Sequence, residues 1–234
     1  MKVALFGNGK MGQLVASQAR AAGHEIGLVV DSNDATCAPE DLVARLRGHD
    51  VAIDFSVAAA VERNVTACAY AGVPLVEGTT GWQSQQAAVC RVVVDQNAGL
   101  IYGANFSVGV NIFYGVVARA AELFARANDY APFIEEAHHD QKRDAPSGTA
   151  LRLRDLLKAR MDREIPIAST RAGSIPGTHR VGFDSAADQI MLTHTARSRA
   201  GFAAGALMAA NWIVGRKGVF EFSEMLNQIM NDRK

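Results

Sequence analysis

The densest cluster of side chains that could carry out chemistry lies in the second half of the chain, ahead of an expected helix. His138 and His139 are of the type that donates protons, and Lys142 adds a cation. Gly148 and Thr149 open the expected helix, whose free N–H groups could bind a carboxylate. Hydride addition to an unsaturated, anionic substrate needs such groups, because carboxylates must be held and the product protonated. The alternative is a solvated, charged loop.

A metal centre is a weaker interpretation of the same histidines. Neighbouring residues of a strand point in opposite directions, and the chain has neither a His-x-x-x-His motif nor paired cysteines. We therefore expect no metal. His24 and His49 fit surface turns, while His179 and His194 fit structural or peripheral substrate-binding positions better than ligation.

A glycine motif near the N-terminus predicts a dinucleotide site. It follows an apolar run at residues 3–6 and opens a helical pattern. The first glycine permits a tight turn, the second lets the backbone approach a pyrophosphate, and the third lets helix and strand pack closely. A plain glycine-rich turn is the alternative. The motif reads Gly7, Asn8, Gly9, Lys10, Met11 and Gly12.

Asp31 follows the second expected strand, where a carboxylate accepts hydrogen bonds from the adenosine ribose. That carboxylate also repels a 2′-phosphate, and residues 32–34 contain no cation to offset it. We therefore expect NADH to be used at least as well as NADPH. An ordinary solvated turn carboxylate is the alternative.

Two further segments lie where open α/β sheets bind ligands. Gly78, Thr79 and Thr80 follow the fourth expected strand, and residues 105–107 follow the fifth. Small residues let the backbone approach a nicotinamide or ribose. Taken alone, either segment could equally be a generic turn.

The order of elements predicts the fold class. Apolar runs at 3–6, 25–30, 51–55, 73–77 and 100–102 alternate with helical patterns ending near 22, 70 and 94, which indicates βαβ units and a parallel sheet. After residue 105 the pattern changes. Long helices are expected at 109–128, 149–161 (with Ser147 as its N-cap), 202–214 and 221–230, and extended segments at 131–139, 171–183 and 189–196. We predict a Rossmann-type domain (1–107), an α+β sheet domain (108–200) and C-terminal helices (201–234) packing back on the first.

Bulk properties exclude several classes of protein. The 234 residues carry 24 basic and 24 acidic side chains, so no overall charge favours nucleic acid or an anionic membrane. Cys37, Cys68 and Cys90 fit free thiols in a reducing compartment. With neither a signal-peptide pattern nor an apolar run long enough to span a membrane, we expect a cytoplasmic protein.

Several motifs together resemble the 4-hydroxy-tetrahydrodipicolinate reductase family, also called dihydrodipicolinate reductase, over nearly the whole chain. Besides the glycine motif at residues 7–12, they are IDFS (53–56), GTTG (78–81), NFSVGVN (105–111) and EAHHDQKRDAPSGTA (136–150). The last is highly specific, whereas the first occurs in many oxidoreductases.

The resemblance implies a role for each matching residue. It makes His138 the proton donor, Lys142 the catalytic cation, His139 a substrate-binding residue, and Gly148 with Thr149 the backbone site for a substrate carboxylate. It also implies a homotetramer built through the sheet domain. Implied coenzyme contacts are residues 7–12 with Asp31, Gly78, Thr79, Thr80, Gly103, Ala104, Asn105 and Phe106.

Two departures from the family pattern are relevant. Many relatives carry a basic residue after the acidic one at the second strand, whereas Ser32 follows Asp31 here, which argues against strong NADPH use. The chain is also shorter in its connections. Two other functions fit the first half equally well: another dehydrogenase of aspartate-derived metabolites, and a non-catalytic nucleotide sensor. Neither accounts for the His-His, Lys and Ser-Gly-Thr cluster.

Overall fold

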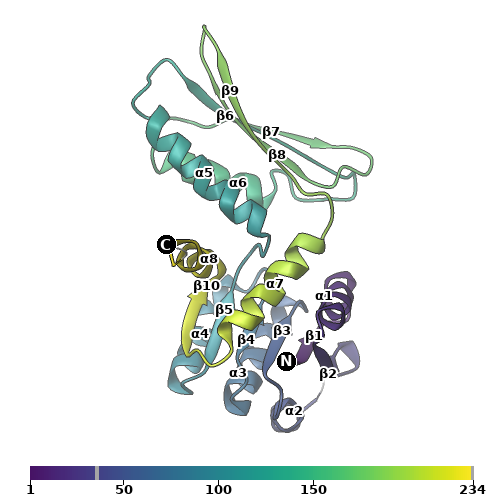
Figure 1. Cartoon of the computed structure of the whole chain (residues 1–234). Coiled ribbons are helices and arrows are strands. Elements are labelled where there is room, and N and C mark those ends of the chain that lie inside the picture. The colour runs from purple at the N-terminus through teal and green to yellow at the C-terminus, as the bar shows by residue number, and fades with distance from the viewer. Residues whose placement is uncertain (35–36, 233–234) are drawn as a thin grey trace. The chain divides into compact units, whose positions relative to one another are not determined.

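The computed structural model of the chain describes residues 1–34 and 37–232. The chain forms two compact units, Met1–Val108 with Arg199–Lys234, and Gly109–Ser198. Figure 1 shows the elements of each unit along the chain. In the described part of the chain, none of the helices combines the length and apolar character needed to cross a membrane.

The first unit is built on a sheet of parallel strands in the order β10-β5-β4-β3-β1-β2. The strands are β1 (Lys2–Phe6), β2 (Glu25–Val30), β3 (Val51–Asp54), β4 (Leu75–Glu77), β5 (Gly99–Tyr102) and β10 (Gly218–Glu221). The central strands are almost wholly buried and mainly apolar, as expected for a sheet covered on both faces, although β3 ends in Asp54 and β4 in Glu77.

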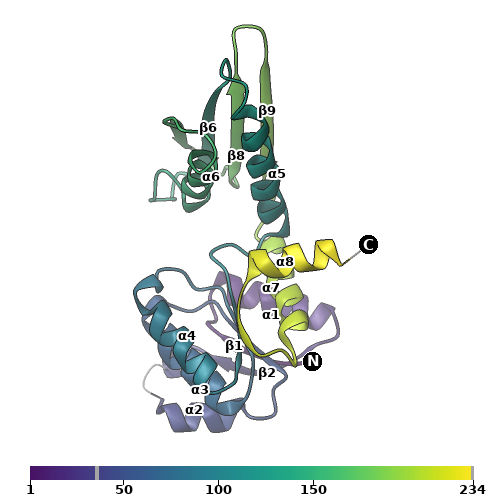
Figure 2. The same cartoon turned by 90° about the vertical axis from the view of Figure 1, so that its left-hand side faces the viewer.

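Helices cover both faces of this sheet, as Figure 2 shows. Val3 and Leu5 of β1 face one core, while Ala4 and Phe6 face the other, as alternation along a strand requires. The first core includes residues from α1 (Lys10–Ala21), α7 (Ala200–Ile213) and α8 (Phe222–Asn231). The second includes residues from α2 (Pro39–Leu46), α3 (Val61–Ala71) and α4 (Gln86–Asp95).

Strand order fixes where a ligand can bind in this unit. β1 lies between β2 and β3, so the connections leaving β1 and β2 run in opposite directions across the sheet. Such a switch point opens a crevice at the carboxyl ends of the two central strands. The predicted Rossmann-type fold is confirmed, with the glycine motif at that edge.

The second unit is a mixed sheet in the order β7-β6-β8-β9, with β6 parallel to β7 and antiparallel to β8. Its strands are β6 (Ala131–His138), β7 (Ile167–Arg171), β8 (Thr178–Asp184) and β9 (Gln189–Thr195). Helices α5 (Val108–Phe124) and α6 (Gly148–Lys158) pack on the face that presents Ile134, Val181 and Phe183. The predicted α+β sheet domain is therefore also confirmed.

The element predictions missed three segments. Helix α2 and strands β7 and β10 were not expected, and residues 215–218 were interpreted only as a break between helices. In the extended segment expected at 171–183, Arg171 is the last residue of β7 and β8 begins only at Thr178, because Gly173 (φ +48°) and Gly177 (φ +113°) form a turn between them. Helix α5 ends at Phe124, short of residue 128.

Candidate active site

The glycine motif has the shape that a bound pyrophosphate requires. Gly7 adopts φ +93°, and a Cβ there would overlap the carbonyl oxygen of Phe55. A Cβ at Gly12 would overlap the carbonyl oxygen of Gly7, so only glycine lets α1 pack against this turn. A Cβ at Gly9 would meet nothing within 4 Å. The backbone at Gly9 is therefore open to a ligand, while the other two glycines are structural.

The start of α1 suits an anion. Gly9 caps the helix without a side-chain hydrogen bond, and the first turn contains no acidic residue, so N–H groups remain for phosphate oxygens. A cavity of about 550 Å³ adjoins this turn. It is lined by Gly9, Lys10, Met11, Phe55, Ser56, Val57, Ala58, Gly78, Thr79 and Thr80.

Two buried carboxyl groups hold the loops beside this cavity. The Asp54 Oδ1 accepts hydrogen bonds from the Ser56 N–H (2.7 Å) and the Thr79 hydroxyl (3.2 Å), and the Glu77 Oε1 accepts one from the Thr79 N–H (2.7 Å). Burial and the neighbouring Asp54 raise the pKa of Glu77 well above its usual value. The Thr79 hydroxyl is thus hydrogen-bonded within the protein, whereas Thr80 is exposed.

The loop that follows β5 presents backbone rather than side chains. Phe106 is only 2% exposed, and its ring packs on Phe222 with centroids 4.7 Å apart. The Asn105 Oδ1 accepts a hydrogen bond from the Ser107 N–H at 2.9 Å. Gly103 and Ala104 complete the turn, so coenzyme contacts predicted for residues 103–106 would involve mainly main-chain atoms.

Asp31 lies at the carboxyl end of β2, as the sequence indicated. Its Oδ1 accepts a hydrogen bond from the Asn33 N–H at 2.9 Å, and its own N–H donates to the Asp34 Oδ2. The nearby cation Arg45 is bound to Asp34, with Nη1 2.6 Å from Oδ1. Arg63 donates to the Asp34 carbonyl at 3.1 Å. Both guanidinium groups therefore already bind Asp34, which the sequence did not reveal.

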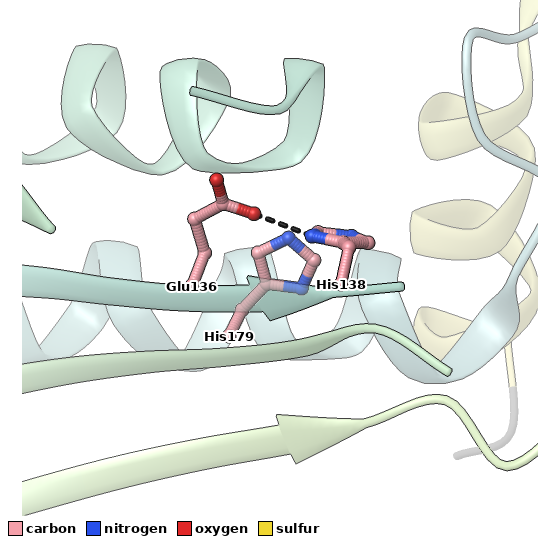
Figure 3. Close-up of side chains that lie close together, drawn as sticks. All are labelled: Glu136, His138 and His179. Atoms are coloured by element: carbon pink, nitrogen blue, oxygen red, sulfur yellow. Dashed lines mark ion pairs between the residues drawn. The ribbon is translucent and has the colours of Figure 1, made fainter. Parts of the chain in front are cut away.

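In the second unit, the end of β6 presents a buried acid–base pair, drawn in Figure 3. The Glu136 Oε2 lies 2.5 Å from the His138 Nδ1. The two residues share a face because they are two positions apart in a strand. His179 of β8 pairs with Glu136 across the sheet, and its ring centroid lies 5.1 Å from that of His138.

Arg171 of β7 keeps Glu136 charged. Its Nη2 lies 2.7 Å from the Glu136 Oε1. Burial would raise the pKa of Glu136, but hydrogen bonds from Arg171 and Ser169 and the charge of His138 outweigh it and lower the pKa to about 2. The pKa of His138 is lowered by burial, and Glu136 only partly offsets this.

His179 connects this pair to the start of α6. Burial and the nearby His138 lower the pKa of His179 to about 4, so the ring is neutral near pH 7. The Ser147 Oγ accepts a hydrogen bond from the Ala150 N–H (3.3 Å) and lies 3.1 Å from the His179 Nε2. Ser147 is the N-cap, as predicted.

Lys142 lies in the loop between β6 and α6, and its side chain is 25% exposed. Its ammonium contacts both carboxylate oxygens of Asp144, at 2.7 and 2.9 Å. Gly148 and Thr149 begin α6 just after the cap, with Gly148 exposed. His139 is half-buried and follows the last residue of β6. The unit thus brings the His138 imidazole, the Lys142 ammonium and the start of α6 together on neighbouring segments.

A metal centre must be weighed here, because Glu136, His138 and His179 offer ligand atoms within 4.8 Å of one another. However, the 2.5 Å between Oε2 and Nδ1 is shorter than the roughly 3.3 Å between two ligands of one tetrahedral zinc ion. Arg171 also places a positive charge on the same carboxylate. This geometry fits a proton between the two atoms better than an ion.

Several of these residues were missed from the sequence. Glu136 could have been found, because a residue two positions before His138 in a strand shares its face. Arg171 and His179 come from other strands and gave no local signal. The lining residues of the cavity at 55–58 lie at and just after the end of an expected strand but were not assigned to the coenzyme.

The parallel sheet with its glycine cradle, together with the acid–base cluster of the second unit, defines a nicotinamide-dependent oxidoreductase. The family model for the N-terminus of dihydrodipicolinate reductase matches residues 1–106, and the model for its C-terminus matches residues 109–226. The chain therefore belongs to the dihydrodipicolinate reductase family, which uses NADH or NADPH, as the sequence indicated.

Known proteins agree with this assignment. The 4-hydroxy-tetrahydrodipicolinate reductase of Christiangramia forsetii is 36% identical over 99% of this chain and 100% of its own length. That of Methanosarcina mazei is 40% identical over 76% of this chain and 73% of its own. A dipicolinate-bound dihydrodipicolinate reductase from Paenisporosarcina sp. TG-14 shares the fold, with a TM-score of 0.79 at 23% identity, over 94% of this chain and 97% of that one.

Proposed function

We propose that this chain reduces 4-hydroxy-tetrahydrodipicolinate to tetrahydrodipicolinate with NADH or NADPH, in diaminopimelate and lysine biosynthesis. The observation that supports this most is the pairing of His138 with a buried carboxylate beside Lys142 and a helix start, in a chain of this family. Over the reaction the substrate loses its hydroxyl as water and gains one hydride and one proton.

Residues of the first unit hold the coenzyme, which supplies the hydride when bound. N–H groups at the start of α1 would bind the pyrophosphate, and the Asp31 carboxylate would accept hydrogen bonds from the adenosine ribose hydroxyls. The remaining proposed contacts line the edge of the sheet. They are residues 7–12, Gly78, Thr79, Thr80, Gly103, Ala104, Asn105 and Phe106.

Residues of the second unit act on the substrate. Lys142 and the first N–H groups of α6, at Gly148 and Thr149, hold its carboxylates and stabilise the negative charge that forms when hydride arrives. His139 adds a further contact. His138 donates a proton from Nε2, the ring nitrogen that does not face Glu136. The relative with bound dipicolinate supports a small dicarboxylate as substrate.

We further propose a cytoplasmic homotetramer formed through the second unit. The sheet face opposite α5 and α6 presents Phe133 and Met191, and Met191 is 38% exposed. An apolar sheet face of this kind suits a subunit interface. In functional terms, residues 1–107 bind the coenzyme, 108–200 bind the substrate and assemble the subunits, and 201–234 complete the first domain.

A coupled assay tests the proposal. The synthase that forms the cyclic substrate is added with pyruvate and aspartate semialdehyde, and absorbance of the reduced coenzyme is followed. Loss of absorbance only when the cyclic dicarboxylate is present supports the proposed reaction. No oxidation with that substrate, or equal oxidation with simple aldehydes and ketones, would contradict it.

A further inference from the structure

We propose that Glu136 is a positioning residue that fixes the tautomer and orientation of His138 for proton donation, an inference that rests on the proposed function. The Glu136 Oε2 lies 2.5 Å from the His138 Nδ1, and the Glu136 side chain is fully buried. A carboxylate this close to Nδ1 holds a proton there in both the charged and the neutral ring. The reacting proton is therefore carried on Nε2.

The carboxylate of Glu136 cannot easily turn away from His138. Its other oxygen, Oε1, is held by the Arg171 Nη2 at 2.7 Å. Arg171 is itself fixed, because Nη2 also donates to the Asp144 carbonyl (2.6 Å) and Nη1 to the Thr170 carbonyl (2.8 Å). Arg171, Glu136 and His138 thus form one chain of contacts across β7 and β6, and this chain also ties down the loop that carries Lys142.

The other edge of the His138 ring faces the turn before β8. A Cβ at Gly177 would lie 3.3 Å from the Nε2 and Cδ2 of His138. The backbone of this turn therefore comes close to the ring, and glycine permits that approach because it has no side chain. The ring is 12% exposed, and no described residue hydrogen-bonds its Nε2. Only Nε2 can therefore reach a substrate while Nδ1 stays with Glu136.

The charge around His138 explains why a carboxylate is needed. His138 is half enclosed by Lys142 of the loop, Arg171 of β7 and His179 of β8, and both cations oppose its protonation. Glu136 is the anion among the groups with the largest effects on it. Without that anion the protonated form of His138 would be rarer at neutral pH.

The experiment compares Glu136→Gln with Glu135→Gln, a matched control one position earlier on β6, where Glu135 forms an exposed ion pair with Arg180. In Glu136→Gln we expect kcat to fall at least tenfold with KM for NADH unchanged. The fall of kcat at rising pH should also begin about one pH unit or more lower than in the wild type. Glu135→Gln should match the wild type in both respects.

Nitrogen-15 NMR of the unmodified protein gives a test that does not depend on the variant folding. The neutral His138 ring should carry its proton on Nδ1, and Glu136→Gln should lower the pH at which the ring titrates. An Nε2–H tautomer in the wild type, or an unchanged titration in a folded variant, would overturn the inference. If the unmodified protein did not oxidise NADH in the presence of the cyclic dicarboxylate, the proposed function would fail instead, so the two failures are distinguishable.

Discussion

The ammonium of Lys142 is bound by both carboxylate oxygens of Asp144, two positions further along the same loop. The Asp144 carbonyl in turn accepts a hydrogen bond from Arg171. The loop thus holds the ammonium in place before any substrate arrives. A cation fixed in advance needs little rearrangement when negative charge forms on a substrate.

Replacing Lys142 with alanine should therefore lower kcat by about 10²–10³ while NADH binding stays normal. The reason is that the developing charge loses a cation that is held in place beforehand, whereas the proposed coenzyme contacts lie in the other unit. Steady-state kinetics with a parallel fluorescence titration of NADH measure both quantities. Lys158→Ala removes a lysine of α6 that forms an exposed pair with Glu164, and it should behave as the wild type. Equal rates for the two variants would exclude a role for Lys142.

The coenzyme preference follows from the surroundings of Asp31. Its carboxylate repels a 2′-phosphate, and Arg45 is held by Asp34 at 2.6 Å. We expect kcat/KM for NADH to equal or exceed that for NADPH. Asp34→Ala should release Arg45 and improve NADPH relative to NADH by about five- to tenfold, or about 1 kcal/mol. A strong NADPH preference in the unaltered chain would refute the assignment of Asp31.

Acid should destabilise the protein in two stages. The pKa of His179 is about 4 in the folded state, below its ordinary 6.5, so the unfolded chain binds the proton first. Stability should therefore fall by on the order of 3 kcal/mol as pH drops from 6.5 to 4. Glu136, whose folded pKa is about 2 against an ordinary 4.5, adds a further loss from about pH 5 downward.

Denaturant unfolding from pH 7 to pH 4 measures the first stage. His179→Asn removes the titrating ring, so its unfolding free energy should vary less with pH than that of the wild type. If the unfolding free energy varied with pH equally in both proteins, the His179 ring would not be neutral in the folded state.

A glycine in α7 packs against the loop that follows β5, for which we propose coenzyme contacts. A Cβ at Gly205 would overlap the carbonyl oxygen of Phe106, and it would also approach the ring of Phe222. Gly205→Ala should cost about 1–3 kcal/mol of stability and weaken NADH binding, because the helix must move away from the loop. Gly115→Ala in α5 meets nothing within 4 Å and should be neutral or stabilising. Equal melting temperatures for the two variants would contradict this close packing.

The sequence predicted the parts of the fold that have a strong local pattern. The apolar runs of β1, β3 and β5 and the glycine turn were recognisable because a parallel sheet buries its strands completely. Strand β7 was missed because it is short and mostly exposed. Strand β10 was missed because its pairing with β5 joins segments more than a hundred residues apart, and its glycines indicated only a break.

The candidate site was predicted to a similar extent. His138, Lys142 and the helix start lie within one stretch of chain, so their chemistry could be interpreted directly. The partners that set the charge state of His138 come from distant parts of the chain. Arg171 and His179 reach Glu136 and His138 only through the register of β7 and β8 with β6. Register depends on tertiary packing, which one sequence does not display.

The turnover of His138→Gln, followed as oxidation of NADH in the presence of the cyclic dicarboxylate, tests the proton-donor assignment most directly. We predict a fall of about 10²–10³ in kcat with an unchanged dissociation constant for NADH. His24→Gln, in the turn between α1 and β2, should leave both values unaltered. Near-normal turnover of His138→Gln would contradict the account.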